Sequence, residues 1–105
     1  MFWTNESELE GNRVLALHGE LDMLSQAHAS DTLGYAVSLP PSRVICDLEK
    51  LEFLDCAGLR VLLRTRKHCE SLGGWLILSS PRGAVARMLH ALGMDEHFLI
   101  WEGED

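Results

Sequence analysis

The chain has 105 residues, of which 47% are hydrophobic and 24% charged, and its formal net charge is −7. This length and this apolar fraction suit one domain with one core, so we expect a single domain over residues 1–105. The negative charge argues against nucleic-acid binding, which needs a basic surface. No apolar run approaches the roughly 20 residues that cross a bilayer, and the first residues lack the pattern of a signal peptide. We therefore expect a cytoplasmic protein that does not insert into a membrane.

The first elements along the chain read as a β-hairpin followed by a helix. Strands are expected over Phe2–Leu9 and Arg13–His18, because turn-forming residues separate these two runs. Gly19–Asp22 then leaves the second strand. Alanine and leucine at roughly helical spacing indicate a helix over Leu24–Ser38, and Pro40-Pro41 end it.

The middle of the chain contains a strand, a tight turn and an amphipathic helix. Arg43–Leu48 is a nearly continuous apolar run, which suits a strand buried on both faces. After the turn, a helix is expected from Gly58 to Leu72. At about 100° per residue its apolar side chains fall in one arc, which predicts packing on a sheet, and its polar side chains fall in the opposite arc. The apolar arc contains Val61, Leu62, Thr65, Cys69 and Leu72, and the polar arc contains Arg60, Arg64, Lys67, His68 and Ser71.

The last third of the chain repeats this alternation of strand and helix. Gly73-Gly74 end the preceding helix, and Trp75–Ser79 reads as another buried strand. Ser80-Pro81 supplies a helix cap followed by proline at the first helical position. Gly93 closes this third helix, which we expect to pack in the core. Its apolar residues at helical spacing are Val85, Met88, Leu89 and Leu92.

Phe98–Trp101 reads as a final short strand, and Glu102–Asp105 as an acidic tail. The complete order is β-β-α-β-α-β-α-β. Alternating strands and helices imply parallel pairing with right-handed crossovers, while the opening hairpin is antiparallel. The sequence therefore predicts an α/β domain with a mixed sheet and helices packed on it.

The turn Asp55-Cys56-Ala57-Gly58 has the construction of a binding site at a helix N-terminus. The first N–H groups of a helix have no partner within it, and the helix dipole adds positive potential there. Such a point suits an anion or a polar group of a partner protein. Asp55 either caps these donors or contacts the partner, and Asp22 has the same two possible roles. Cys56 is either a reactive, redox-sensitive thiolate or a small residue that fills the loop.

Two short motifs resemble those of the STAS domains, the bacterial anti-sigma-factor antagonists. Phe53–Leu59, with the sequence FLDCAGL, is similar to the signature loop of that family, and Gly19–Asp22 is similar to its second conserved motif. The resemblance extends over nearly the whole chain and implies the STAS fold. The family usually adds one more C-terminal helix, for which this chain has no residues. A surface is then left bare or is covered by something else, and an exposed apolar patch of that kind marks a partner surface.

The signature loop departs from the family at the residue that matters for regulation. Phosphorylated members carry Asp-Ser-Ser-Gly or Asp-Ser-Thr-Gly, and the hydroxyl before the glycine accepts the phosphate. That position is Ala57 here, and the preceding serine position is Cys56. The resemblance therefore implies that this switch is absent at its usual place. Either binding is constitutive, or oxidation of Cys56 regulates it.

Both motifs follow strands at their carboxyl ends, where α/β sheets present their sites. We therefore expect the partner to bind a surface near this edge, although the basic residues within it could also form an ordinary solvated helix face. The expected partner surface comprises the loop Leu54–Gly58, the outer face of the following helix and the neighbouring loop Asp22–Ser25. The expected partner-binding residues are Asp22, Leu54, Asp55, Cys56, Ala57, Gly58, Arg60 and Arg64.

The resemblance implies two alternative functions, both of them protein binding. In the first, the chain is an anti-sigma-factor antagonist that binds an anti-sigma factor with a kinase-like ATP-binding domain and so releases a sigma factor for transcription. In the second, it is a STAS subunit of a lipid-transporting ABC transporter and docks on the transporter's ATPase in the cytoplasm. The pairing of the two motifs favours the first.

Nothing in the sequence indicates an enzyme, a metal site or a cofactor. A cysteine nucleophile needs a base within reach, and no histidine is near Cys56 in the sequence. The five histidines lack the spacing of metal ligands, and the three cysteines match no zinc or redox pattern. Phosphate-binding and dinucleotide-binding glycine motifs are also missing from the sequence.

Overall fold

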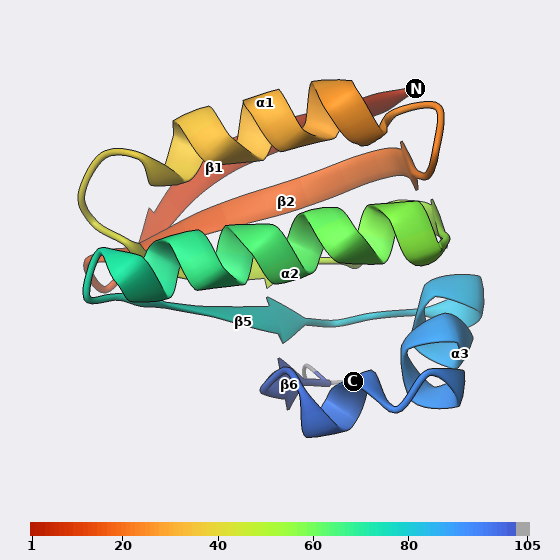
Figure 1. Ribbon diagram of the computed structural model, residues 1–105. Helices are drawn as coiled ribbons and strands as arrows, with labels where there is room; N and C mark the ends of the chain where they lie inside the picture. The colour runs from red at the N-terminus through yellow and green to blue at the C-terminus, as the bar shows by residue number, and fades with distance from the viewer. Residues whose placement is uncertain (103–105) are drawn as a thin grey trace.

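The computed structural model describes residues 1–102 and shows a mixed sheet with two long helices on one side (Figure 1). The order of elements agrees with the predicted α/β domain. The elements are β1 (Phe2–Leu9), β2 (Asn12–Leu21), α1 (Gln26–Val37), β3 (Arg43–Asp47), β4 (Leu51–Leu54), α2 (Cys56–Ser71), β5 (Trp75–Ser79), α3 (Gly83–Ala91), the 3₁₀ helix η1 (Met94–Glu96) and β6 (Ile100–Trp101).

The sheet has six strands. Its main order is β1-β2-β3-β5-β6, and β4 also pairs with β2. β1 and β2 are antiparallel and joined by Glu10 and Gly11, whose positive φ angles of 52° and 80° suit a tight hairpin turn. All other pairs are parallel. The predicted hairpin and the predicted mixed sheet are therefore confirmed.

β4 is a strand that the sequence analysis did not predict, because it assigned no element between the strand ending at Leu48 and the turn at Asp55–Gly58. β3 pairs with the first half of β2, and β4 pairs with its last residues, Gly19–Leu21. β2 consequently continues to Leu21, three residues beyond the predicted end at His18. A strand of four residues has little periodicity of its own, so its pairing with β2 defines it.

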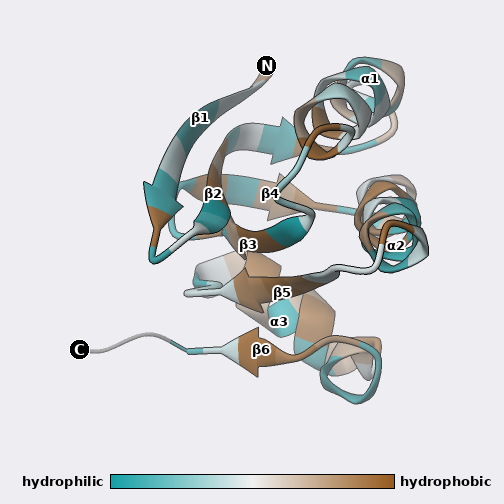
Figure 2. Cartoon of the chain, turned by 90° about the vertical axis from the view of Figure 1, so that its left-hand side faces the viewer, coloured by the Kyte–Doolittle hydropathy of each residue, from teal (hydrophilic) through white to brown (hydrophobic). Residues whose placement is uncertain are grey.

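The core lies between the sheet and the pair α1 and α2, which pack side by side (Figures 1 and 2). α2 carries the predicted amphipathic pattern, with one exception. Leu72 is 48% exposed, because the helix ends at Ser71 and Leu72 is its C-cap. The buried residues of α2 are Gly58, Leu59, Val61, Leu62, Thr65 and Cys69.

The predicted start of the third helix is wrong by two residues. α3 begins at Gly83 with Arg82 as an extended N-cap, whereas Ser80 has a φ of 54° and donates its N–H to the Trp101 carbonyl at 2.7 Å. Ser80 therefore continues the pairing of β5 with β6 rather than capping the helix. Val85 and Leu89 are buried as predicted, and α3 packs against β4.

The ends of several elements also differ from the sequence-based expectation. α1 is shorter than Leu24–Ser38 at both ends, and β6 contains only the last two residues of Phe98–Trp101. Leu92 follows α3 and is 40% exposed. Gly93 follows the C-cap of α3 and has a φ of 66°, the left-handed conformation typical of a glycine that terminates a helix.

Within residues 1–102, no helix combines the length and the apolar character that a membrane span requires. The acidic tail beyond Glu102 lies outside the described residues. The expectation that a further C-terminal helix is missing also concerns residues outside the described range and stays a prediction.

Candidate functional site

The two motifs meet at the carboxyl edge of the sheet. β2 and β4 are parallel neighbours with Leu21 opposite Leu54, so the loops that follow them emerge side by side. The first loop, Asp22–Ser25, leads into α1, and the second junction, centred on Asp55, leads directly into α2. This juxtaposition confirms that both motifs lie at one edge.

Asp55 ties the two loops together. Its Oδ1 accepts a hydrogen bond from the Gly58 N–H at 2.9 Å, which makes it the N-cap of α2. Its Oδ2 accepts from the Met23 N–H of the other loop at 3.1 Å, and its own N–H donates to the Leu21 carbonyl at 3.3 Å. Both carboxylate oxygens are therefore used within the chain. Of the two roles considered for Asp55, the structure shows capping.

Gly58 allows the start of α2 to lie against the end of β2. A Cβ at this position would stand 2.0 Å from the Leu21 carbonyl oxygen and 2.9 Å from Leu21 Cγ. No side chain fits at that distance, so glycine is required for the contact. Gly58 is therefore small because it packs against β2 of the same chain. Cys56, in contrast, is exposed on the surface.

Asp22 stabilises its own loop. Its Oδ1 accepts from the Ser25 N–H at 2.9 Å, and its own N–H donates to Ser25 Oγ at 3.0 Å. Ser25 Oγ also donates to the Glu20 carbonyl at 2.8 Å. The hydrogen bond from the Ser25 backbone lowers the pKa of the Asp22 carboxyl group below its usual value. Asp22 therefore caps the turn before α1, and the N-cap of α1 itself is Ser25.

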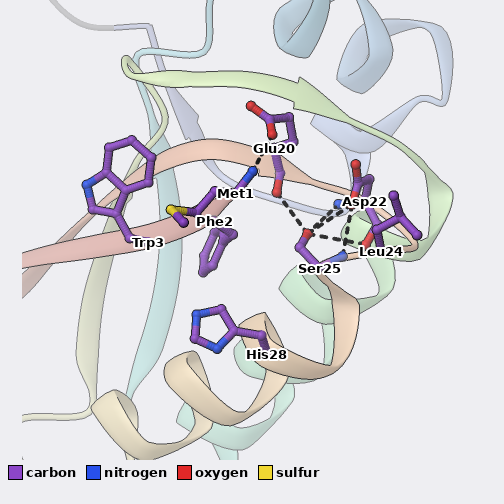
Figure 3. A pocket seen from close by; sticks show the side chains of 8 residues that line it. All are labelled: Met1, Phe2, Trp3, Glu20, Asp22, Leu24, Ser25 and His28. Atoms are coloured by element: carbon purple, nitrogen blue, oxygen red, sulfur yellow. Dashed lines mark hydrogen bonds and ion pairs between the residues drawn. The ribbon is translucent and has the colours of Figure 1, made fainter.

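A pocket of about 600 Å³ opens beside the Asp22 loop (Figure 3). Phe2 and His28 both line it, and their rings pack edge to face with centroids 6.3 Å apart. Asp22 supplies a carboxylate at its border, whereas the Glu20 carboxylate pairs with the N-terminal amino group of Met1. Leu24 is 93% exposed. The loop thus combines negative charge with accessible apolar surface.

The exposed apolar residues of this edge were not singled out in the sequence, although the expected loop Asp22–Ser25 contains two of them. Met23 is 72% exposed, and Leu24 and Phe53 are 93% and 43% exposed. Met23 and Leu24 follow Asp22 in the chain, and Phe53 precedes Leu54. Large apolar side chains held in water at one place are typical of a protein-binding surface. Their position beside the two motifs is the feature of the sequence that could have indicated their place in a binding surface.

The expected partner-binding residues divide into two groups in the structure. Leu54 and Gly58 are buried, so they shape the surface from beneath and are not accessible to a partner. Arg60 and Arg64 lie exposed on the outer face of α2, and Ala57 is half-buried in its first turn. The accessible residues therefore run from the Asp22 loop across the start of α2.

Cys56 is an exposed free thiol, whereas Cys46 and Cys69 are buried. Burial raises the pKa of Cys46 to about 12 and that of Cys69 to about 11, so both stay protonated at neutral pH. Two histidines have other contacts: His18 stacks on Trp3, and His28 faces Phe2. Residues 1–102 contain no cluster of three side chains suited to hold a metal ion.

The sequence model of the STAS-domain family matches residues 5–105. The chain belongs to the STAS family. This STAS chain is 29% identical over 92 residues to the anti-sigma-F factor antagonist RsfB of Mycobacterium tuberculosis, covering 87% of this chain and 74% of RsfB. It is also 29% identical to RsfA of the same organism over 82 residues, covering 76% of this chain and 64% of RsfA.

Solved structures agree with this family. The STAS chain superposes on the crystal structure of an anti-sigma factor antagonist from Mycobacterium paratuberculosis with a TM-score of 0.85 and 27% identity, covering 98% of this chain and 87% of the other. The fold is therefore the STAS fold, as the two motifs implied.

Proposed function

We propose that this STAS protein is an anti-sigma-factor antagonist, which binds an anti-sigma factor and so releases a sigma factor. The similarity to RsfB over 87% of the chain carries the proposal, because RsfB is named for that activity. The proposed partner is an anti-sigma factor with a kinase-like ATP-binding domain in the cytoplasm. The protein acts by binding, and the proposal contains no catalytic step.

The proposed partner surface, called the edge surface below, combines the accessible residues of the two motifs with the apolar residues beside them. Its central part is the first turn of α2, where the Asp55 cap holds the helix start against the Asp22 loop. Apolar side chains supply area that loses water on binding, and the charges at the rim set the orientation of the partner. The edge surface consists of Asp22, Met23, Leu24, Phe53, Cys56, Ala57, Arg60 and Arg64.

We further propose that binding is constitutive. A phosphate at the start of a helix adds up to about two negative charges, and a surface fitted to a neutral side chain rejects it. Ala57 has no hydroxyl group to accept a phosphate, so this switch is missing at position 57. Control then lies in the amount of the protein or in the partner.

A charge at Ala57 tests the edge surface. We expect Ala57→Asp to weaken binding of the cognate anti-sigma factor at least about 100-fold in calorimetric titration, because an unpaired buried charge is costly. Ala84→Asp is the matched control, since Ala84 is also the second residue of a helix, α3, and is exposed. Asp is favourable in the first turn of a helix, so both variants should stay folded. Unchanged binding by Ala57→Asp would contradict the edge surface.

Further measurements test the regulation of binding and the identity of the partner. Incubation with the cognate kinase and ATP should add no phosphate in intact-mass analysis. A stoichiometric phosphate that abolishes binding would overturn constitutive binding. Peroxide should leave binding unchanged. If peroxide weakens binding by the wild type but not by Cys56→Ser, the cysteine is a redox switch instead. Binding to a transporter ATPase in place of any anti-sigma factor would refute the antagonist function.

A further inference from the structure

In the part of the chain that the structure describes, one face of strands β1, β2 and β3 carries no helix. Figure 2 shows α1 and α2 on the same side of the sheet, and no helix lies along the other side of β1, β2 and β3 within residues 1–102. Burial along the strands follows this division. In β3, Val44 and Cys46 point to the helices and are buried, whereas Ile45 and Asp47 are only half-buried and Arg43 is exposed. The expectation that this strand is buried on both faces is therefore wrong.

The strand register places the half-buried residues side by side. Val14 of β2 lies opposite Ile45 of β3, and Ile45 lies opposite Ile77 of β5. Because side chains alternate between faces along a strand, residues in register share a face. The open face, as it is called below, consists of Trp3, Asn5, Ser7, Leu9, Asn12, Val14, Ala16, His18, Glu20, Arg43, Ile45, Asp47, Trp75, Ile77 and Trp101. Ser79 has the same register but is buried.

All three tryptophans of the chain are on the open face. Trp3 is 46% exposed and stacks on His18 with a centroid distance of 4.9 Å. Trp75 is half-buried, and Trp101 at the opposite edge of the sheet is 54% exposed. Tryptophan contributes more than most residues to the energy of protein interfaces. Trp3 and Trp101 thus lie on the two edge strands of the open face, and the aliphatic residues Val14, Ile45 and Ile77 lie between them.

The charges of the open face are few and balanced. The chain as a whole has a net charge of −7, yet three open-face residues carry formal charges, namely Glu20, Arg43 and Asp47. Glu20 forms an ion pair with the N-terminal amino group of Met1, which leaves Arg43 and Asp47. They have opposite signs and lie at the two ends of the exposed side of β3. At about 3.3 Å per residue they are separated by roughly 13 Å, with Ile45 midway between them.

We propose that the open face binds a second copy of this chain, with a two-fold axis that lies between the two sheets and runs across the strands through Ile45. Such an axis reverses the strand direction, so Arg43 of each copy faces Asp47 of the other and the two Ile45 side chains meet at the centre. An axis along the strands would instead place Arg43 against Arg43. The charge pattern is therefore complementary to itself in one arrangement, as an isologous interface requires.

This arrangement leaves the edge surface free. α2 lies on the other side of the sheet, and the carboxyl ends of the strands of the two copies point in opposite directions. A dimer could therefore hold two partner molecules at once.

Sedimentation equilibrium of the full chain from about 10 μM to about 1 mM tests the proposal. We expect the mass to rise from 11.7 kDa toward twice that value. Arg43→Asp should weaken the dimer at least about tenfold, because two aspartates then face each other across the interface. Combining it with Asp47→Arg should restore the dimer, because the opposite charges then meet again. Lys67→Asp makes the same change of charge on the exposed side of α2 and should have no effect.

A second approach does not depend on Asp47, whose Oδ1 also accepts a hydrogen bond from the Glu49 N–H at 3.0 Å. Ile45→Lys places two like charges at the centre of the proposed interface and should give a monomer. Iodide should quench tryptophan fluorescence less as the wild-type concentration rises, and equally at all concentrations for Ile45→Lys. Thermal melts show that each variant is folded. A wild type that stays monomeric at about 1 mM, or a folded Ile45→Lys that still dimerises, would refute the proposal.

Discussion

The two glycines inside α1 and α2 allow a direct test of the contact that forms the edge surface. Gly58 lies in the first turn of α2, and an added Cβ would stand 2.0 Å from the Leu21 carbonyl oxygen. Gly34 lies in α1, and an added Cβ there would meet nothing within 4 Å. The same substitution, glycine to alanine, therefore has opposite consequences at the two positions.

The expected magnitudes follow from these distances. Alanine is favoured over glycine in a helix by up to about 1 kcal/mol, so Gly34→Ala should stabilise the protein by about 0.5–1 kcal/mol. Gly58→Ala has the same helical advantage but places a carbon more than 1 Å inside the ordinary separation of about 3.5 Å. The Leu21 carbonyl cannot move freely, because it accepts the Asp55 N–H at 3.3 Å. Overpacking of this kind costs about 1–3 kcal/mol or more, so we expect a net loss of about 2 kcal/mol.

Urea unfolding followed by tryptophan fluorescence measures both effects. The midpoint should rise for Gly34→Ala and fall for Gly58→Ala, with similar slopes for the two variants. Gly58→Ala should also weaken binding of the anti-sigma factor, because the start of α2 must move away from β2. Equal or greater stability of Gly58→Ala relative to the wild type would refute the reasoning, since it would mean that α2 and β2 are not in contact at Leu21.

Three further predictions concern the core and the thiols. Leu62→Ala should lower the free energy of unfolding by about 2–5 kcal/mol in urea melts, because Leu62 is fully buried, and a loss below about 1 kcal/mol would show that it is not in the core. A maleimide should label only Cys56 in the folded protein and all three cysteines in denaturant. Burial raises the pKa of Cys46 from 9.0 to about 12, so its contribution to stability is complete below pH 9 and is lost as the pH rises toward 12. Between pH 8 and pH 10 the wild type should therefore lose about 1.4 kcal/mol more than Cys46→Ala, and parallel curves would contradict this.

Local interactions determined the parts of this fold that the sequence predicted. The hairpin between β1 and β2 depends on the turn at Glu10 and Gly11, both of which have positive φ angles, a conformation that glycine adopts readily. The buried face of α2 follows from helical spacing alone, and Gly93 closes the region after α3 through its own backbone conformation. Each of these features is encoded within a few neighbouring residues.

Pairing between distant segments determined the rest. Leu51–Leu54 is a strand only because β2 continues far enough to pair with it. Leu72 is exposed because α2 ends one residue earlier. The angular pattern assumes an unbroken helix and so does not predict where the helix ends. Asp55 and Met23 are 32 residues apart and are joined only when β2 and β4 align. The apolar run of β3 suggested burial on both faces, but α1 and α2 pack on the same side of the sheet. Which side a connecting helix takes depends on the crossover geometry of the whole chain, and the residues of a single strand do not encode it.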